Sequence, residues 1–121
     1  MEIGVDIVEI SRIRALYDRF GAVFMKRILT EAEMAQCLSR PDPVASLAGR
    51  FAAKEAVSKA LGTGISRGLS FRSIEVLNDQ AGKPQVRLHP GSPTGDVPCR
   101  ISISISHDRH SAVAMALVEP A

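Results

Sequence analysis

Three ionisable side chains are of the types that bind a divalent cation and neutralise phosphate charge. Asp6 follows a glycine in an alternating segment, and Glu55 lies within an otherwise apolar helical stretch. Lys59 comes one helical turn after Glu55, on the same face of a helix. Because magnesium prefers one or two carboxylates and leaves its other positions to water and substrate phosphates, these residues are candidates for a magnesium site with a neighbouring lysine.

Each of these residues also has a simpler explanation. A Glu-Lys pair spaced by four residues can be a surface ion pair worth a few tenths of a kcal/mol. Asp6 can cap a helix or a loop, and a lone histidine such as His107, at a strand end, is usually structural. The sequence has no zinc-like cysteine or histidine spacing, no phosphate-binding glycine loop and no nucleophile elbow. The residues alone therefore leave catalysis and structure open.

The elements that must position these residues can be predicted from hydrophobic periodicity. Residues 2–9 alternate as a strand, so Asp6 points away from the face that carries Ile3, Val5 and Ile7. Ser11 is the expected N-cap of a helix that Gly21 ends, and a second helical piece covers about 22–29. Thr30 and Glu33 form a capping box for a helix to about Leu38. The longest predicted helix covers 44–61.

The second half of the sequence predicts strands. Residues 69–78 and 85–89 are typical of a hairpin, and 90–98 is an expected exposed loop. Residues 101–106 alternate isoleucine with serine, and 111–118 are apolar enough for a central strand covered on both faces. This order favours an α+β domain spanning 1–121, in which helices cover one face of a mainly antiparallel sheet.

Composition limits the function classes. The chain is 45% hydrophobic with a net charge of only +2, which argues against a general nucleic-acid binder. Its apolar stretches are shorter than the roughly 20 residues that span a bilayer, so we expect a cytoplasmic protein with no membrane segment. Positive charge is concentrated near the N-terminus and forms either a surface for an acidic partner or a solvated helix face: Arg12, Arg14, Arg19, Lys26 and Arg27.

Four segments together resemble the holo-[acyl-carrier-protein] synthases, the small trimeric class of the 4'-phosphopantetheinyl transferase superfamily. They are GVDIVEI at 4–10, KRILTEAE at 26–33, GRFAAKEAVSKALGTG at 49–64 and ISISHD at 103–108. The resemblance implies the 4'-phosphopantetheinyl transferase fold, a ferredoxin-like α+β protomer. It also implies transfer of phosphopantetheine from coenzyme A to a serine of an apo acyl carrier protein, within fatty acid and lipid biosynthesis. The other product would be adenosine 3',5'-bisphosphate.

The resemblance also implies roles for individual residues. Asp6 and Glu55 match magnesium-binding acids, and Lys59 matches a lysine that partners the leaving charge. His107 matches a contact to a coenzyme A phosphate or pyrophosphate, and Arg50 matches an arginine near the nucleotide. Because Arg50 projects roughly 140° from Glu55 on an ideal helix, we expect it to serve a neighbouring subunit's site, as in a homotrimer with sites at subunit interfaces.

In the same way, Arg12 matches an arginine that meets the acidic helix of the carrier protein, and Arg19 and Lys26 extend this surface. The general base stays open, with a metal-bound water a candidate beside the side chains. Asp108 either supplies a third metal oxygen or pairs with Arg109 or a nearby turn, and we favour the pairing. Two other functions remain alternatives: a magnesium-dependent nucleotide or pyrophosphate hydrolase, and a non-enzymatic basic adaptor for acidic proteins.

Overall fold

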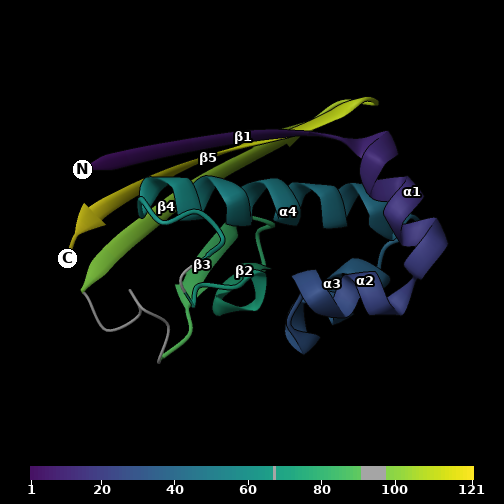
Figure 1. Ribbon diagram of the computed structural model, residues 1–121, viewed down its shortest axis with the longest axis horizontal. Helices are drawn as coiled ribbons and strands as arrows, with labels where there is room; N and C mark the ends of the chain where they lie inside the picture. Colours follow the sequence, from purple (N-terminus) through teal and green to yellow (C-terminus); the bar gives the residue numbers. More distant parts are fainter. Residues whose placement is uncertain (67, 91–97) are drawn as a thin grey trace.

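The computed structural model describes residues 1–66, 68–90 and 98–121, and it confirms the predicted α+β architecture (Figure 1). One antiparallel sheet has the order β1-β5-β4, and a separate hairpin pairs β2 with β3. In chain order, the described helices and strands are β1 (Glu2–Glu9), α1 (Ile10–Phe20), α2 (Ala22–Ile28), α3 (Glu31–Leu38), α4 (Pro43–Ala60), the 3-10 turn η1 (Phe71–Ser73), β2 (Ile74–Asn78), β3 (Pro84–Leu88), β4 (Cys99–His107) and β5 (Ser111–Pro120).

Helix α4 is the centre of the fold and lies between the three-stranded sheet and the β2–β3 hairpin (Figure 1). Its sheet-facing contacts are with β1 and β5, where small side chains allow close approach. Three alanines of β5 are fully or almost fully buried: Ala112, Ala114 and Ala116. On β1, a Cβ added to Gly4 would overlap the carbonyl oxygen of Ala56. The sheet and α4 are therefore held at a distance that larger side chains would not permit.

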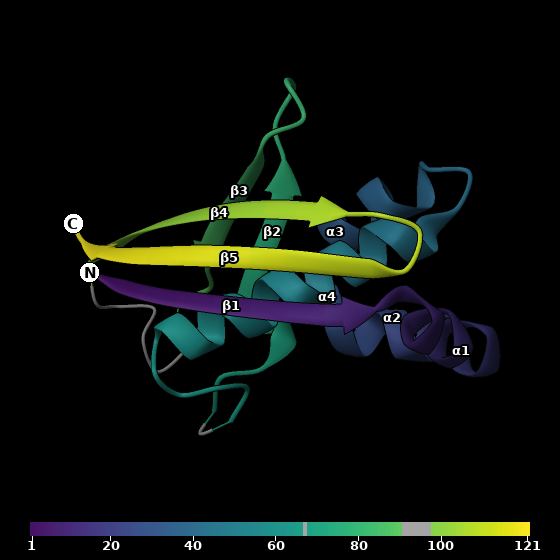
Figure 2. The same ribbon diagram turned by 90° about the horizontal axis from the view of Figure 1, so that it is seen from above.

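The other face of the sheet has no helix over it in the described part of the chain (Figure 2). Ile3, Val5 and Ile7 are 65%, 55% and 68% exposed, and Met115 on β5 is 53% exposed. The alternation predicted for β1 is correct, but Gly4 and Val8 are buried while the three larger apolar residues face outward. The prediction that β5 is covered on both faces is wrong for this single chain, because α4 covers only one.

The helix boundaries agree closely with the sequence. Asp42 caps α4 by accepting a hydrogen bond from the Val44 amide at 3.1 Å, and the capping box of Thr30 and Glu33 is present. Gly21 ends α1, as predicted. The Ser11 cap is wrong, because α1 begins two residues earlier than that cap predicts, at Ile10, and Glu9 takes the N-cap position without a side-chain bond.

Two further expectations have different outcomes. Most of the predicted loop at 90–98 lies outside the described residues, which end at Pro90 and resume at Pro98. Among the described residues, none of the helices combines the length and apolarity needed to span a bilayer. The cytoplasmic location stays a prediction.

Candidate functional site

The structure brings Asp6 of β1 and Lys59 of α4 together, although they are far apart in the sequence. The Lys59 Nζ atom donates to Asp6 Oδ1 at 2.9 Å and to the backbone oxygen of Val5 at 3.1 Å. The Asp6 side chain is 17% exposed, whereas that of Lys59 is 51% exposed. The lysine therefore covers the aspartate on the solvent side and keeps part of its own charge available to a ligand.

Glu55 lies half-buried beside this pair. Burial raises the pKa of Glu55, and the negative charge of Asp6 raises it further, while Lys59 and Arg12 act in the opposite direction. Two carboxylates that repel each other at a partly dehydrated position are a favourable arrangement for a cation, since its charge would relieve the repulsion.

The donor set of this site fits magnesium. Within residues 1–66, 68–90 and 98–121, no group of three or more histidine, cysteine, aspartate or glutamate side chains is arranged to hold a metal. Asp6 and Glu55 supply two hard oxygen donors, and magnesium commonly keeps water and substrate phosphates in its other positions. These two residues could therefore hold a magnesium ion, which would then depend on the substrate for further ligands.

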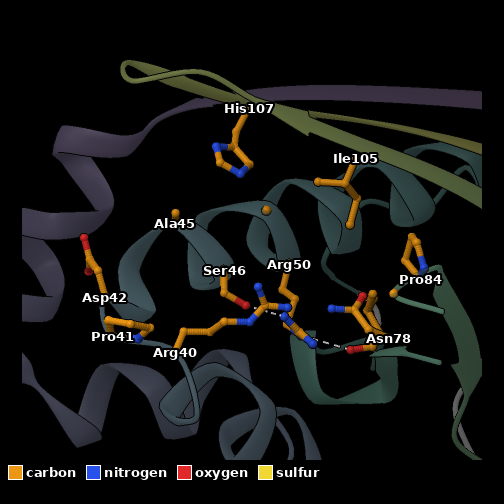
Figure 3. A pocket seen from close by; sticks show the side chains of 13 residues that line it. Arg40, Pro41, Asp42, Ala45, Ser46, Arg50, Asn78, Pro84, Ile105 and His107 are labelled. Carbon is orange, nitrogen blue, oxygen red and sulfur yellow. Dashed lines mark hydrogen bonds between the residues drawn. The ribbon is translucent and has the colours of Figure 1, made fainter. Parts of the chain in front are cut away.

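Arg50 and His107 lie together in a different place. Both line a pocket of about 440 Å³ between the start of α4, the β2–β3 hairpin and the end of β4 (Figure 3). His107 points into the pocket from the end of β4, and Arg40 and Asp42 lie on the side opposite the hairpin. Asp6, Glu55 and Lys59 do not line it. The predicted site residues thus fall into two groups on one subunit.

Arg50 is almost completely buried, and its guanidinium forms part of the pocket wall. Its Nε donates to the Val76 backbone oxygen at 3.0 Å, and its other nitrogens donate to Gln36 Oε1 at 2.6 Å and to Ser46 Oγ. Gln36 also accepts from the Asn78 amide at 2.9 Å. The sequence reasoning missed Gln36 and Ser46; the i, i+4 spacing of Ser46 to Arg50 on α4 was a signal for one of them.

The basic N-terminal surface is present on α1 and α2, where Arg12, Arg19 and Lys26 are all exposed. Arg12 is close enough to Glu55 to oppose the rise of its pKa, which places this arginine next to the two carboxylates. Arg14 is instead engaged with Asp42, at 2.6 Å.

Asp108 stabilises the turn between β4 and β5. Its Oδ1 accepts hydrogen bonds from the backbone amides of His110 and Ser111, each at 2.8 Å. These bonds lower the pKa of Asp108. The expectation that Asp108 pairs with a nearby turn is confirmed.

An apolar groove of about 710 Å³ was not anticipated from the sequence. It lies between α1, α2, the middle of α4 and η1, and Phe51 in its lining precedes Glu55 by one helical turn. Phe51 and Phe71 stack there with their ring centroids 5.2 Å apart. The residues that line the groove are Leu16, Phe20, Val23, Phe24, Arg27, Ile28, Phe51, Ile65, Ser70 and Phe71.

Comparison with known protein families decides between the alternatives. Residues 2–116 match the family model of the 4'-phosphopantetheinyl transferase superfamily. The chain belongs to this superfamily. Among curated relatives, the holo-[acyl-carrier-protein] synthase of Chlorobaculum tepidum is 75% identical over 120 residues, which cover 99% of both chains. That of Chlorobaculum parvum is 67% identical with the same coverage.

Solved structures of the family share the fold. The holo-[acyl-carrier-protein] synthase of Neisseria meningitidis is 40% identical, with a TM-score of 0.88, and the match covers 98% of this chain and 97% of that one. The synthase of Bacillus anthracis, in complex with coenzyme A (3',5'-ADP), is 41% identical with a TM-score of 0.86, covering 99% and 96%. The 4'-phosphopantetheinyl transferase fold predicted from the sequence is confirmed.

Proposed function

We propose that this chain transfers the 4'-phosphopantetheine arm of coenzyme A to a serine hydroxyl of an apo acyl carrier protein. The serine oxygen forms a new bond to the β-phosphorus, and the bond from that phosphorus to the bridging oxygen breaks. Adenosine 3',5'-bisphosphate leaves, and the serine proton passes to a base that stays unassigned. Synthases with this activity in their name match nearly the whole chain.

The observation that carries this proposal is the cluster of Asp6, Glu55 and Lys59 beside the exposed Arg12. Asp6 and Glu55 would hold a magnesium ion, which would supply positive charge to offset that of the pyrophosphate. Lys59 contacts a phosphate oxygen and stabilises the leaving charge. Because phosphoryl-type transfer depends mainly on positioning and on electrostatic stabilisation, these two contributions are most of what the protein must provide.

Arg50 and His107 contact the nucleotide end of coenzyme A. Their pocket is lined by Arg40, Arg50 and His107 beside Asp42, which suits a phosphate-bearing nucleotide, and it does not include Asp6 or Glu55. Since one subunit keeps these two groups apart, one subunit supplies Asp6, Glu55 and Lys59 while a neighbour supplies Arg50 and His107. This division is the reason for proposing a homotrimer with sites at subunit interfaces.

The exposed face of the sheet is the surface through which the subunits associate. Ile3, Val5, Ile7 and Met115 are all more than half exposed on it, and a contiguous apolar surface of this kind marks an interface. Identical strands from other copies would bury it.

Arg12, Arg19 and Lys26 bind the acidic surface of the carrier protein. The place of Arg12 beside Glu55 would bring the acceptor serine of a docked carrier close to the two carboxylates. The charge contrast also accelerates encounter, in a salt-dependent manner.

Intact-protein mass spectrometry tests the proposal. An apo acyl carrier protein is incubated with this protein, coenzyme A and Mg²⁺, beside a control that contains a chelator. We expect the phosphopantetheine mass increment on the carrier, and its loss on chelation. Release of adenosine 3',5'-bisphosphate without the increment would indicate the hydrolase, and carrier binding without any product would indicate the adaptor.

A further inference from the structure

Among the residues that the structure describes, Lys54 is the largest side chain that is completely buried, and its charge is not part of the proposed site. Its Nζ atom donates to Glu33 Oε1 at 2.6 Å, to the Ile28 backbone oxygen at 2.6 Å and to the Phe71 backbone oxygen at 3.0 Å. An ammonium group has three protons, so all of its donors are used. The three acceptors belong to three different elements: α2, α3 and η1.

Glu33, the partner of Lys54, is also completely buried and is bonded through both oxygens. Oε1 accepts from the Thr30 amide at 2.8 Å as well as from Lys54, and Oε2 accepts from the Val76 amide at 2.8 Å. Val76 in turn offers its backbone oxygen to Arg50. The ion pair thus connects α4, which carries Lys54, with α3, which carries Glu33, and with β2 through Val76. Val76 also links it to Arg50 in the wall of the pocket.

Two of the groups bonded to Lys54 form the apolar groove. Ile28 and Phe71 both line it, and Phe71 stacks on Phe51 of α4. Because Lys54 bonds to the backbones of both, it sets how far α2 and η1 stand from α4.

Stability alone is a weak reason for a charged pair at this position. Burial lowers the pKa of Lys54, and the charge and hydrogen bond of Glu33 oppose that shift. A buried ion pair can often be replaced by apolar or neutral groups of similar volume without loss of stability. Such a replacement does not reproduce the three directional hydrogen bonds that Lys54 Nζ donates from α4 to α2, α3 and η1.

We propose that Lys54 is a positioning residue: its buried ammonium fixes the rotation and depth of α4 against α2, α3 and η1. Lys54 and Glu55 are consecutive and project about 100° apart, so a rotation of the helix that relaxes Lys54 moves Glu55 relative to Asp6. The proposal rests on the proposed function, in which Glu55 and Asp6 hold magnesium together.

The test is the double variant Lys54→Met with Glu33→Gln, because Lys54→Met alone would leave a buried carboxylate without its counter-charge. Val44→Ala, a buried change in the same helix at a distance from Glu55, serves as the control for lost packing. For each protein, far-UV circular dichroism, the urea midpoint, kcat, the KM for the carrier protein and the Mg²⁺ concentration that gives half-maximal rate are measured.

We expect the double variant to fold, to lose at least tenfold in kcat and to need severalfold more Mg²⁺, with the KM for the carrier within twofold of the parent. Val44→Ala should lower the urea midpoint and leave kcat and the Mg²⁺ requirement unchanged. If the double variant Lys54→Met with Glu33→Gln does not fold, the double variant Lys54→Gln with Glu33→Gln replaces it, with the same expected result. A folded pair with the parent's kcat and Mg²⁺ requirement would overturn the positioning role. An inactive parent protein would instead overturn the proposed function.

Discussion

Gly4 of β1 lies against the backbone of Ala56 so closely that there is no room for a side chain between them. A Cβ at Gly4 would overlap the Ala56 carbonyl oxygen and would lie 2.8 Å from the Ala60 amide nitrogen. Both neighbours are backbone atoms of α4 and cannot rotate away. Because Asp6 is two residues further along the same face of β1, this contact also sets the distance between Asp6 and the helix that carries Glu55 and Lys59.

Gly4→Ala should therefore separate β1 from α4. We expect the free energy of unfolding to fall by about 1–3 kcal/mol, as for overpacked cores. The Mg²⁺ concentration that gives half-maximal transfer rate should rise. Urea unfolding and Mg²⁺ titration of the rate are the measurements. Gly49→Ala is the matched control, because its Cβ would meet only the movable Ile105 Cγ2 atom, at 3.1 Å. Equal stability losses in the two variants would contradict the interpretation.

Glu55→Gln removes one of the two proposed magnesium ligands while it keeps the size of the side chain. We expect transfer to fall by about 100-fold or more, with an unchanged circular dichroism spectrum. Mg²⁺ should raise the melting temperature of the parent and not that of the variant. Glu31→Gln, an exposed change at the start of α3, is the control and should behave like the parent. A fully active Glu55→Gln protein would refute the metal assignment.

Arg12→Ala should act on the carrier rather than on coenzyme A. We expect the KM for the carrier protein to rise roughly tenfold at low salt, and the difference from the parent to shrink as salt is added, because screening already weakens the parent's attraction. The KM for coenzyme A should change little. Arg100→Ala removes an exposed arginine from β4 and is the control for net charge. An equal effect of both substitutions would mean that only overall charge matters.

Met115→Lys places a charge in the middle of the exposed sheet face, which the proposed trimer would bury. We expect the variant to sediment as a monomer and to lose transfer activity, while its secondary structure stays intact. Analytical ultracentrifugation and the carrier assay measure the two effects. The same result would also follow from a dimer, so the parent's molar mass must be measured alongside.

Mixing inactive variants tests whether the sites are shared between subunits. Glu55→Gln and His107→Ala carry their defects in different residue groups, so subunits exchanged between the two trimers should form some intact sites. We expect activity to reappear in the mixture and not in either variant alone. Continued inactivity after demonstrated subunit exchange would place both groups in one subunit's site.

Asp108→Ala should destabilise the protein in a pH-dependent way. The pKa of Asp108 is lower in the folded protein than its ordinary value of 3.8, because the charged form accepts hydrogen bonds from the backbone amides of His110 and Ser111. Its contribution is therefore complete above pH 3.8 and is lost as the pH falls through the lowered pKa. We expect a lower urea midpoint than the parent at pH 7 and a smaller difference near pH 3. A difference that grows on acidification would contradict this role.

Local sequence patterns were sufficient to predict the order of the helices and strands and the helix face that Glu55 and Lys59 share. The Thr30 capping box, the Gly21 terminus and the long run of helix-forming residues located α3, α1 and α4, since each signal acts within a few residues. Alternation also placed Asp6 opposite Ile3, Val5 and Ile7. It did not say which face of β1 is buried, because both faces carry apolar residues and the choice depends on what packs against them.

The sequence by itself determined the element order, the family and the helix face shared by Glu55 and Lys59, because periodicity, capping and motif spacing are properties of neighbouring residues. Only the tertiary structure decided that Lys59 reaches Asp6, that Arg50 and His107 line a separate pocket, and that Lys54 bonds to three elements. The physical reason is that these contacts join segments distant in the sequence. For Lys59 and Asp6, the distance is set by how closely Gly4 and the alanines of β5 let α4 and the sheet approach.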